Sequence, residues 1–181
     1  MLEAARNGDK NAFKELIMKY EQQVARTVIG MLGQGPEAED IGQETFIRFY
    51  RALNQFKGDS GIGTYITRIA INLSLNELRR RKLKAKLFFQ AHESQTDDQL
   101  FNTLPDQNSN ERSEINEMVR KSIEKLDLKS RAVIVLRLID GYSTAETAKI
   151  LELPIGTVLS RLTRAQKKLK TILQPILGGV S

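Results

Sequence analysis

Hydrophobic residues along this chain recur at the three- and four-residue spacing of α-helices, and no stretch alternates clearly enough to predict a β-strand. The spacing predicts an N-terminal group of three or four helices, three of which cover about residues 9–31, 36–53 and 64–87. It predicts a C-terminal group of four, two over residues 112–126 and 129–139 and two within residues 142–170. The predicted fold class is therefore all-α.

Charge divides the chain into two basic segments on either side of an acidic one. Residues 1–87 carry 15 Lys or Arg against 10 Asp or Glu, and residues 112–181 carry 13 against 7. Residues 88–111 carry five acids, no Lys or Arg, and many Gln, Asn and Ser residues, which is the composition of a linker. We therefore predict two small helical domains, residues 1–87 and 112–181, joined by a flexible acidic linker, residues 88–111.

The segment from Tyr142 to Lys170 has the pattern of two short helices joined by a tight turn. Ser143 and Glu146 are spaced as a capping box, and Pro154 suits the first turn of the second helix. That helix has one apolar stripe, formed by Val158, Leu162, Ala165 and Leu169. Residues 154–170 include five basic residues and no acidic one, so we favour a DNA-binding helix-turn-helix. The alternative is an amphipathic helix with a solvated basic face.

Two other charged patterns leave their roles open. The run RRRKLKAK, residues 79–86, suits either a solvated helix end or a surface that binds phosphates, and the second basic helix favours phosphates. Asp40, Glu44 and Arg48 follow one another at four-residue intervals, which by itself indicates an ordinary surface ladder of ion pairs.

Composition narrows the range of functions. The net charge of +6 and the pI of about 9.6 favour nucleic acid as a partner. The chain has no cysteine, which excludes disulfides and thiolate metal sites and fits a cytoplasmic protein, and no apolar run approaches the roughly 20 residues that span a membrane. The single histidine, His92, has no catalytic partner at a recognisable spacing. We therefore expect a non-catalytic protein without metal, cofactor or membrane insertion.

Two long motifs resemble one known family. Residues 38–82, AEDIGQETFIRFYRALNQFKGDSGIGTYITRIAINLSLNELRRRK, resemble the promoter-melting domain of bacterial RNA polymerase sigma factors of the extracytoplasmic-function (ECF) group. Residues 153–169, LPIGTVLSRLTRAQKKL, resemble the second DNA-binding domain of the same proteins. The resemblance implies an alternative sigma factor that binds core RNA polymerase, recognises the −35 and −10 promoter elements, melts the −10 region and directs transcription initiation.

The resemblance also implies roles for individual residues. Docking on the clamp helices of the largest polymerase subunit is implied for Asp40, Gln43, Glu44 and Phe46. Contact with single-stranded −10 DNA is implied for Lys57, Ser60, Tyr65, Asn72, Asn76, Arg79 and Arg80. Contact with duplex −35 DNA is implied for Thr157, Ser160, Arg161, Arg164 and Lys168. The polymerase flap and an anti-sigma factor are further implied partners.

Some positions depart from the family pattern. Tyr65 replaces a usual tryptophan and Ile62 a common aromatic residue, so the surface that holds the strand is less aromatic than usual. Glu152 stands where a turn glycine is common, and Leu159 stands where a basic residue often contacts DNA. These departures bear on the preferred promoter sequence.

The predicted linker is long enough to join two domains that bind DNA at separate places. The 24 linker residues can extend to about 80 Å, which is more than two turns of B-DNA, so they can tether two domains on separate promoter elements.

Two other functions are rivals to a sigma factor. One rival is a conventional regulator that binds duplex DNA through residues 142–170 and dimerises or binds an effector through its N-terminal lobe. The other is an RNA-binding or membrane-surface adaptor that uses residues 79–86.

Overall fold

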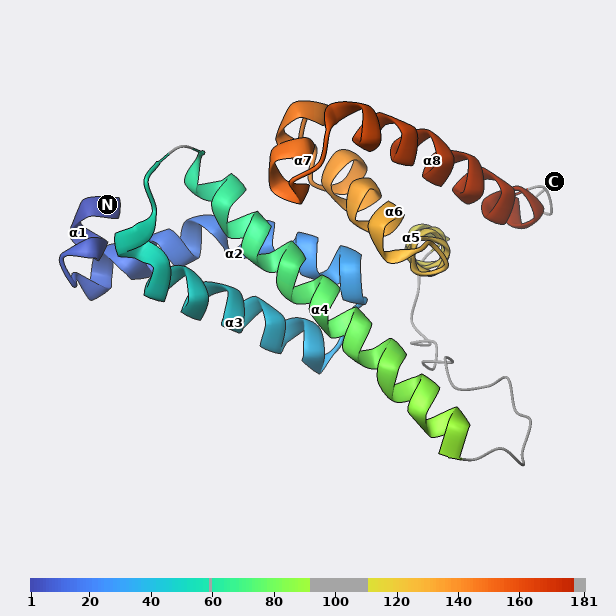
Figure 1. Ribbon diagram of the computed structural model, residues 1–181, viewed down its shortest axis with the longest axis horizontal. Helices are drawn as coiled ribbons and strands as arrows, with labels where there is room; N and C mark the ends of the chain where they lie inside the picture. The colour runs from blue at the N-terminus through green and yellow to red at the C-terminus, as the bar shows by residue number, and fades with distance from the viewer. Residues whose placement is uncertain (59, 92–110, 178–181) are drawn as a thin grey trace.

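The computed structural model describes residues 1–58, 60–91 and 111–177, and within these ranges every regular element is helical (Figure 1). The all-α prediction is confirmed. The N-terminal lobe contains α1 (Leu2–Arg6), α2 (Lys10–Leu32), α3 (Pro36–Ala52), the short 3₁₀ turn η1 (Leu53–Gln55) and α4 (Ile62–Ala91). The C-terminal lobe contains α5 (Glu111–Glu124), α6 (Leu128–Ile134), the π-helical turn η2 (Val135–Ile139), α7 (Thr144–Leu151) and α8 (Ile155–Leu177).

Local sequence signals fix the helix boundaries of the N-terminal lobe. Asp9 caps α2, because its carboxylate accepts hydrogen bonds from the backbone N–H groups of Asn11, at 2.8 Å, and Ala12, at 3.2 Å. Gly33 ends α2 at a φ of +82°, where a side chain would be strained, and Pro36 opens α3. Helices α2, α3 and α4 pack around fully buried side chains such as Phe49.

The predicted linker, residues 88–111, differs at both ends from what the structure shows, and its last residue, Glu111, opens α5. Helix α4 continues to Ala91, so residues 88–91, which were assigned to the linker, are helical. Helical spacing in LKAKLFFQA allows this continuation, whereas charge composition alone suggested an earlier end. Residues 92–110, the remainder of the linker before α5, lie outside the described residues, as does His92.

The two lobes pack against each other at an apolar interface, which the sequence did not predict. One buried cluster combines residues of α2 and α4 with residues of the C-terminal lobe, including Val135, Leu136 and Ile150. Gly30 allows this close approach, because a Cβ atom there would lie 3.1 Å from both methyl carbons of Val135. Figure 1 accordingly shows α5–α7 lying directly beside α2 and α4. We call this contact the lobe interface.

Polar groups also cross the lobe interface. The side-chain amide of Gln23 donates to Thr67 Oγ1 at 2.8 Å and to the Tyr142 hydroxyl at 2.5 Å. Thr27 Oγ1 donates to Asp140 Oδ2 at 2.8 Å. Burial raises the pKa of the Asp140 carboxyl to about 6, although the bond from Thr27 and the charge of Arg26 oppose this shift. The same burial raises the pKa of the Tyr142 hydroxyl.

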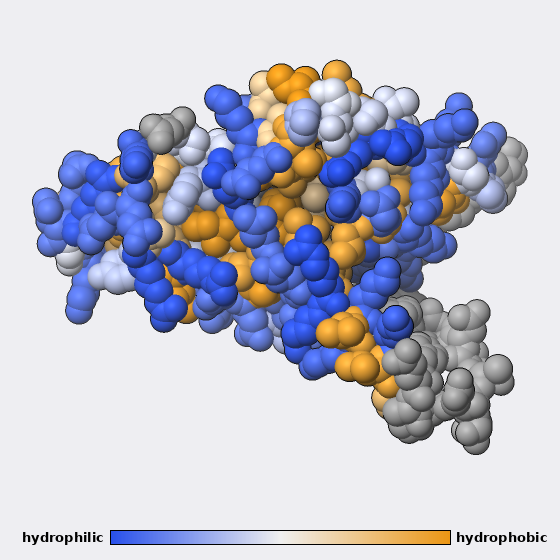
Figure 2. All heavy atoms as spheres, in the orientation of Figure 1, coloured by the Kyte–Doolittle hydropathy of each residue, from blue (hydrophilic) through white to orange (hydrophobic). Residues whose placement is uncertain are grey.

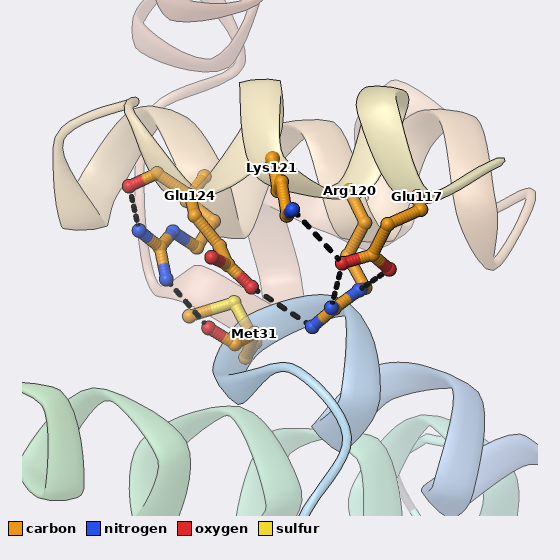
Figure 3. A network of polar contacts seen from close by, with 6 residues as sticks. Met31, Glu117, Arg120, Lys121 and Glu124 are labelled. Carbon is orange, nitrogen blue, oxygen red and sulfur yellow. Dashed lines mark hydrogen bonds and ion pairs between the residues drawn. The ribbon is translucent and has the colours of Figure 1, made fainter. Parts of the chain in front are cut away.

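Arg131 joins the ends of two helices across this interface, at Met31 and Glu124, which are labelled in Figure 3. Its guanidinium donates to the Met31 carbonyl, at the end of α2, at 2.8 Å, and to the Glu124 carbonyl, at the end of α5. Both carbonyls belong to the last turn of a helix, where unpaired carbonyls carry partial negative charge. Arg131 is only 7% exposed, and burial lowers the pKa of its side chain. One buried cation therefore completes a helix end in each lobe.

Candidate functional site

The helix-turn-helix is built as the sequence predicted. Ser143 Oγ accepts from the Glu146 N–H at 3.2 Å, and the Glu146 carboxylate accepts from the Ser143 N–H at 2.8 Å, which completes the capping box of α7. The bonds from Ser143 hold the pKa of the Glu146 carboxyl below its usual value. Glu152 ends α7 at a φ of +53°, and within the described residues it is the only non-glycine with a positive φ. A glycine at this turn would adopt the same φ without strain.

The second helix, α8, turns its apolar stripe inward and its charged side outward. Val158 is fully buried and Ala165 is 2% exposed, and Leu162 and Leu169 pack beside them. Pro154 lies just before α8, and its carbonyl accepts the first helical hydrogen bonds. Helix α8 carries five basic residues and no acidic one. Its exposed side is therefore a cationic surface.

The structure brings the residues predicted to bind −35 DNA onto this one helix. Ser160, Arg164 and Lys168 are exposed, whereas Thr157 and Arg161 are half-buried at the flank of the helix. Arg164 lies along its own helix, where Nε donates to the Ser160 carbonyl at 3.1 Å. Ile155, Leu159 and Thr163 are also exposed on this helix and were not among the residues predicted to bind −35 DNA. In the sequence, Ile155 and Leu159 are recognisable as an apolar pair outside the buried stripe.

A second polar strip follows α4. Asn72, Asn76 and Arg79 are exposed at three- and four-residue spacing, so they share one side of the helix. Arg79 donates to Asn76 Oδ1 at 2.9 Å and forms no ion pair with any described residue. This part of α4 presents amide groups and one unpaired cation, which we call the α4 strip, defined as Asn72, Asn76 and Arg79.

Other residues predicted to bind −10 DNA have partners within the protein. Arg80 donates from Nε and Nη2 to the two carboxylate oxygens of Glu77, at 2.7 and 2.8 Å, and Arg81 donates to the same carboxylate at 3.2 Å. The bond from Arg80 is the main reason that the pKa of Glu77 lies below its usual value. Glu77 and Arg80 are three residues apart within a predicted helix, so the sequence by itself indicates an ion pair between them.

The glycine-rich turn before α4 holds the last members of this group. Lys57 is exposed and Ser60 half-buried, and both lie between η1 and α4. The ring of Tyr65 packs against Phe56, with centroids 4.9 Å apart, and is tilted toward Phe49 at 6.2 Å. Tyr65 therefore supports the turn from inside and shows only part of its ring to solvent.

Two of the four residues predicted to dock on polymerase, Gln43 and Phe46, line a groove between α2 and α3. This groove has a volume of about 660 Å³, and its walls include Gln43 and Phe46 from α3 and Ile17 and Val24 from α2. Glu44 lies nearby and pairs with Arg48 at 2.8 Å, which confirms half of the predicted ladder. Asp40 is exposed and forms no ion pair with a described residue. The groove combines apolar side chains with the carboxylates of Glu21 and Glu39 and the amide of Gln43, and its lining does not include Asp40 or Glu44.

Within residues 1–58, 60–91 and 111–177, no group of three or more His, Asp or Glu residues could hold a metal ion. No described helix is both long and apolar enough to cross a membrane.

Comparisons with known proteins match both lobes. The family model for sigma-70 region 2 matches residues 16–84, and that for sigma-70 region 4 matches residues 116–169. The RNA polymerase sigma-H factor of Pseudomonas aeruginosa is 34% identical over 184 residues, covering 98% of this chain and 94% of that protein. The ECF RNA polymerase sigma-E factor of Escherichia coli K12 is 34% identical over 181 residues, with the same coverage.

Solved structures of two related complexes have the same fold. The structure of CnrH in complex with the cytosolic domain of CnrY matches with a TM-score of 0.71 and 25% identity, covering 96% of this chain and 95% of that one. The sigma factor RpoE of Bartonella quintana, in complex with the anti-sigma factor NepR, matches with a TM-score of 0.68 and 21% identity, covering 90% and 97%.

Proposed function

The chain belongs to the ECF group of bacterial RNA polymerase sigma factors, and from this premise we propose how its two lobes divide the recognition of a promoter. It is a transcription initiation subunit that binds core RNA polymerase and promoter DNA, and we assign catalysis to the polymerase alone. We place its action in the cytoplasm, where bacterial transcription occurs. The roles of individual residues below are proposals that rest on burial, charge and position.

Helix α8 binds the duplex −35 element in the major groove. An α-helix fits this groove, and the acid-free charged side of α8 suits a surface lined by phosphates. Arg164 and Ser160 face outward near the start of the helix, and a bidentate bond from an arginine to guanine supplies roughly 1–3 kcal/mol of discrimination. Lys168, Thr157 and Arg161 lie farther along or at the flank, where phosphate contacts add affinity without sequence preference.

Helix α4 and the turn before it hold the single-stranded −10 element. The α4 strip follows the strand, and Lys57, Ser60 and Tyr65 form the border of a pocket for an unpaired base. Arg80 contributes less than Arg79, because Glu77 already neutralises it. Capture of unpaired bases stabilises the melted state, so this chain needs no nucleotide hydrolysis to open DNA.

The groove between α2 and α3 receives the clamp helices of the largest polymerase subunit. Its apolar floor accepts an apolar side chain, while Asp40, Gln43 and Glu44 supply polar contacts around it. Phe46 forms part of the floor. The polymerase flap would contact the C-terminal lobe, and an anti-sigma factor would bind as partners do in the CnrH and RpoE complexes.

One observation supports the proposal: the acid-free basic side of α8, the α4 strip and the partly apolar groove between α2 and α3 are three separate surfaces, the first in the C-terminal lobe and the other two in the N-terminal lobe. The test is co-purification with core RNA polymerase followed by run-off transcription. We expect a variant with Asp40→Ala and Gln43→Ala to bind core polymerase about tenfold more weakly, which corresponds to a loss of about 1.4 kcal/mol of binding free energy. Its fold should be unchanged, because both residues are exposed.

A matched control carries Glu15→Ala and Asn54→Ala, which remove an exposed acid and an exposed amide away from the groove. It should bind polymerase like the unmodified chain. Equal binding by both double variants would contradict the docking site. If core polymerase began specific transcripts equally well without this chain, or if the chain footprinted its site unaided, the conventional-regulator alternative would replace the sigma-factor assignment.

A further inference from the structure

Two large apolar side chains are exposed at the beginning of the proposed recognition helix. Ile155 is 53% exposed and Leu159 is 50% exposed. They stand four residues apart, so they are neighbours on one side of α8. Figure 2 shows hydrophobic residues gathered at the top of the molecule, where Figure 1 draws α7 and the beginning of α8. Ile155 and Leu159 lie at an edge of the surface that we assign to DNA.

The position of Leu159 separates it from an ordinary exposed leucine. Single exposed apolar residues are common on protein surfaces and need no function. Leu159, however, lies directly beside Ser160 and one turn before Thr163, and both of these neighbours are exposed. Its own helix carries five basic residues and no acid, so this side approaches DNA closely when it binds. The side chain of Leu159 is therefore in contact with water in the free protein and becomes buried only when DNA binds.

We infer that Leu159 selects a thymine in the −35 element by packing against the 5-methyl group of that base. This inference rests on the proposed binding of α8 in the major groove. The methyl group of thymine is the one apolar feature that base edges present there, and apolar side chains recognise it by contact. Cytosine instead presents an amino group, for which a leucine side chain offers no acceptor. Ile155 flanks the same contact on the side of the preceding turn.

The experiment uses holoenzyme assembled from core polymerase and the full chain. A promoter library with a randomised −35 element is transcribed, and transcripts are sequenced for the unmodified chain and for Leu159→Ala. We expect one thymine to be enriched by the unmodified chain and to lose its enrichment with Leu159→Ala, while preferences at other positions persist. In the selected promoter, that thymine is then replaced by deoxyuridine, which removes only the methyl group.

The deoxyuridine promoter should bind the unmodified holoenzyme about fourfold more weakly, the ratio expected for one methyl group lost from an apolar contact. It should bind the Leu159→Ala holoenzyme as well as the thymine promoter does. Leu138→Ala is the matched control, because Leu138 is also exposed, at 54%, but lies in η2 and away from α8. It should keep the thymine preference and the fourfold effect.

The outcomes separate this inference from the proposed function. If the library shows selection in the −35 element but deoxyuridine has no effect, or has the same effect on Leu159→Ala, the methyl contact is overturned and −35 binding stands. If holoenzyme selects nothing in the −35 region, the proposed role of α8 fails and the inference fails with it. Equal unfolding midpoints of the two leucine variants and the unmodified chain would exclude loss of fold as the cause.

Discussion

Replacing Arg131 should destabilise the protein far more than replacing Arg120 (Figure 3), although each arginine donates at least two hydrogen bonds. Arg131 is 7% exposed and donates to the Met31 and Glu124 carbonyls. A hydrogen bond from a charged donor contributes about 1.5–3 kcal/mol. Two such bonds at the lower value give about 3 kcal/mol for Arg131→Ala, because removal of the buried charge also relieves its cost of desolvation.

Arg120 provides the comparison. Its side chain is 25% exposed and pairs with Glu117 and Glu124, whose side chains are 42% and 37% exposed. Pairs of this kind are worth about 0–1 kcal/mol, so Arg120→Ala should change stability little. Arg131→Lys should fall between the two, since one ammonium group does not reproduce the planar fork that spans both carbonyls.

The assay is urea denaturation followed by circular dichroism, with the free energy of unfolding extrapolated to water. All three variants are measured at the same pH and salt concentration. If Arg131→Ala costs no more than Arg120→Ala, burial and helix-end geometry do not set the value of these contacts, and the account of the lobe interface is wrong.

Three further predictions concern stability. Glu152→Gly should raise the free energy of unfolding by up to about 1 kcal/mol, because glycine adopts the positive φ at this position without strain. Glu152→Gln, the control, should leave the free energy of unfolding unchanged, and thermal melts measure both variants. Ser143→Ala should cost about 1 kcal/mol by removing the capping box, and Ser160→Ala, which removes an exposed hydroxyl within α8, is its control. Asp140 has a raised pKa of about 6 in the folded protein, so its carboxyl destabilises the fold as pH rises from about 4 to 6. Asp140→Asn should therefore be more stable than the unmodified chain at pH 7.5, and this advantage should disappear at pH 4; a constant difference between the two pH values would contradict the assignment.

Local signals in the sequence predicted much of the fold. The Asp9 cap, the Pro36 start and the Ser143–Glu146 capping box each depend on neighbours within four residues, so the chain itself specifies them. The packing of the lobes was not predictable in this way. Gln23 and Tyr142 meet across 119 residues, and nothing in either local pattern indicates its partner.

In the candidate surfaces too, features set by local periodicity were predictable and features set by tertiary packing were not. The exposure of Ser160 and Arg164 was predictable because helical periodicity separates an exposed side from a buried one, whereas their contact with DNA is implied by the family resemblance. The partial burial of Tyr65 against Phe56 and Phe49 depends on how η1, α3 and α4 come together, which periodicity does not contain. The exposed position of Leu159 was visible as a leucine outside the apolar stripe, but its significance required the shape of the whole helix surface.

The close fit of Gly30 against Val135 has a practical consequence for anyone who divides this polypeptide in two. A fragment of residues 1–91 and a fragment of residues 111–181 would each carry half of the apolar lobe interface. Each fragment alone would expose that apolar surface to water and would tend to associate through it. Mixed together, the fragments hold every side chain of that contact and should reassemble without a peptide connection. Such a split pair would allow each promoter-binding half to be labelled separately.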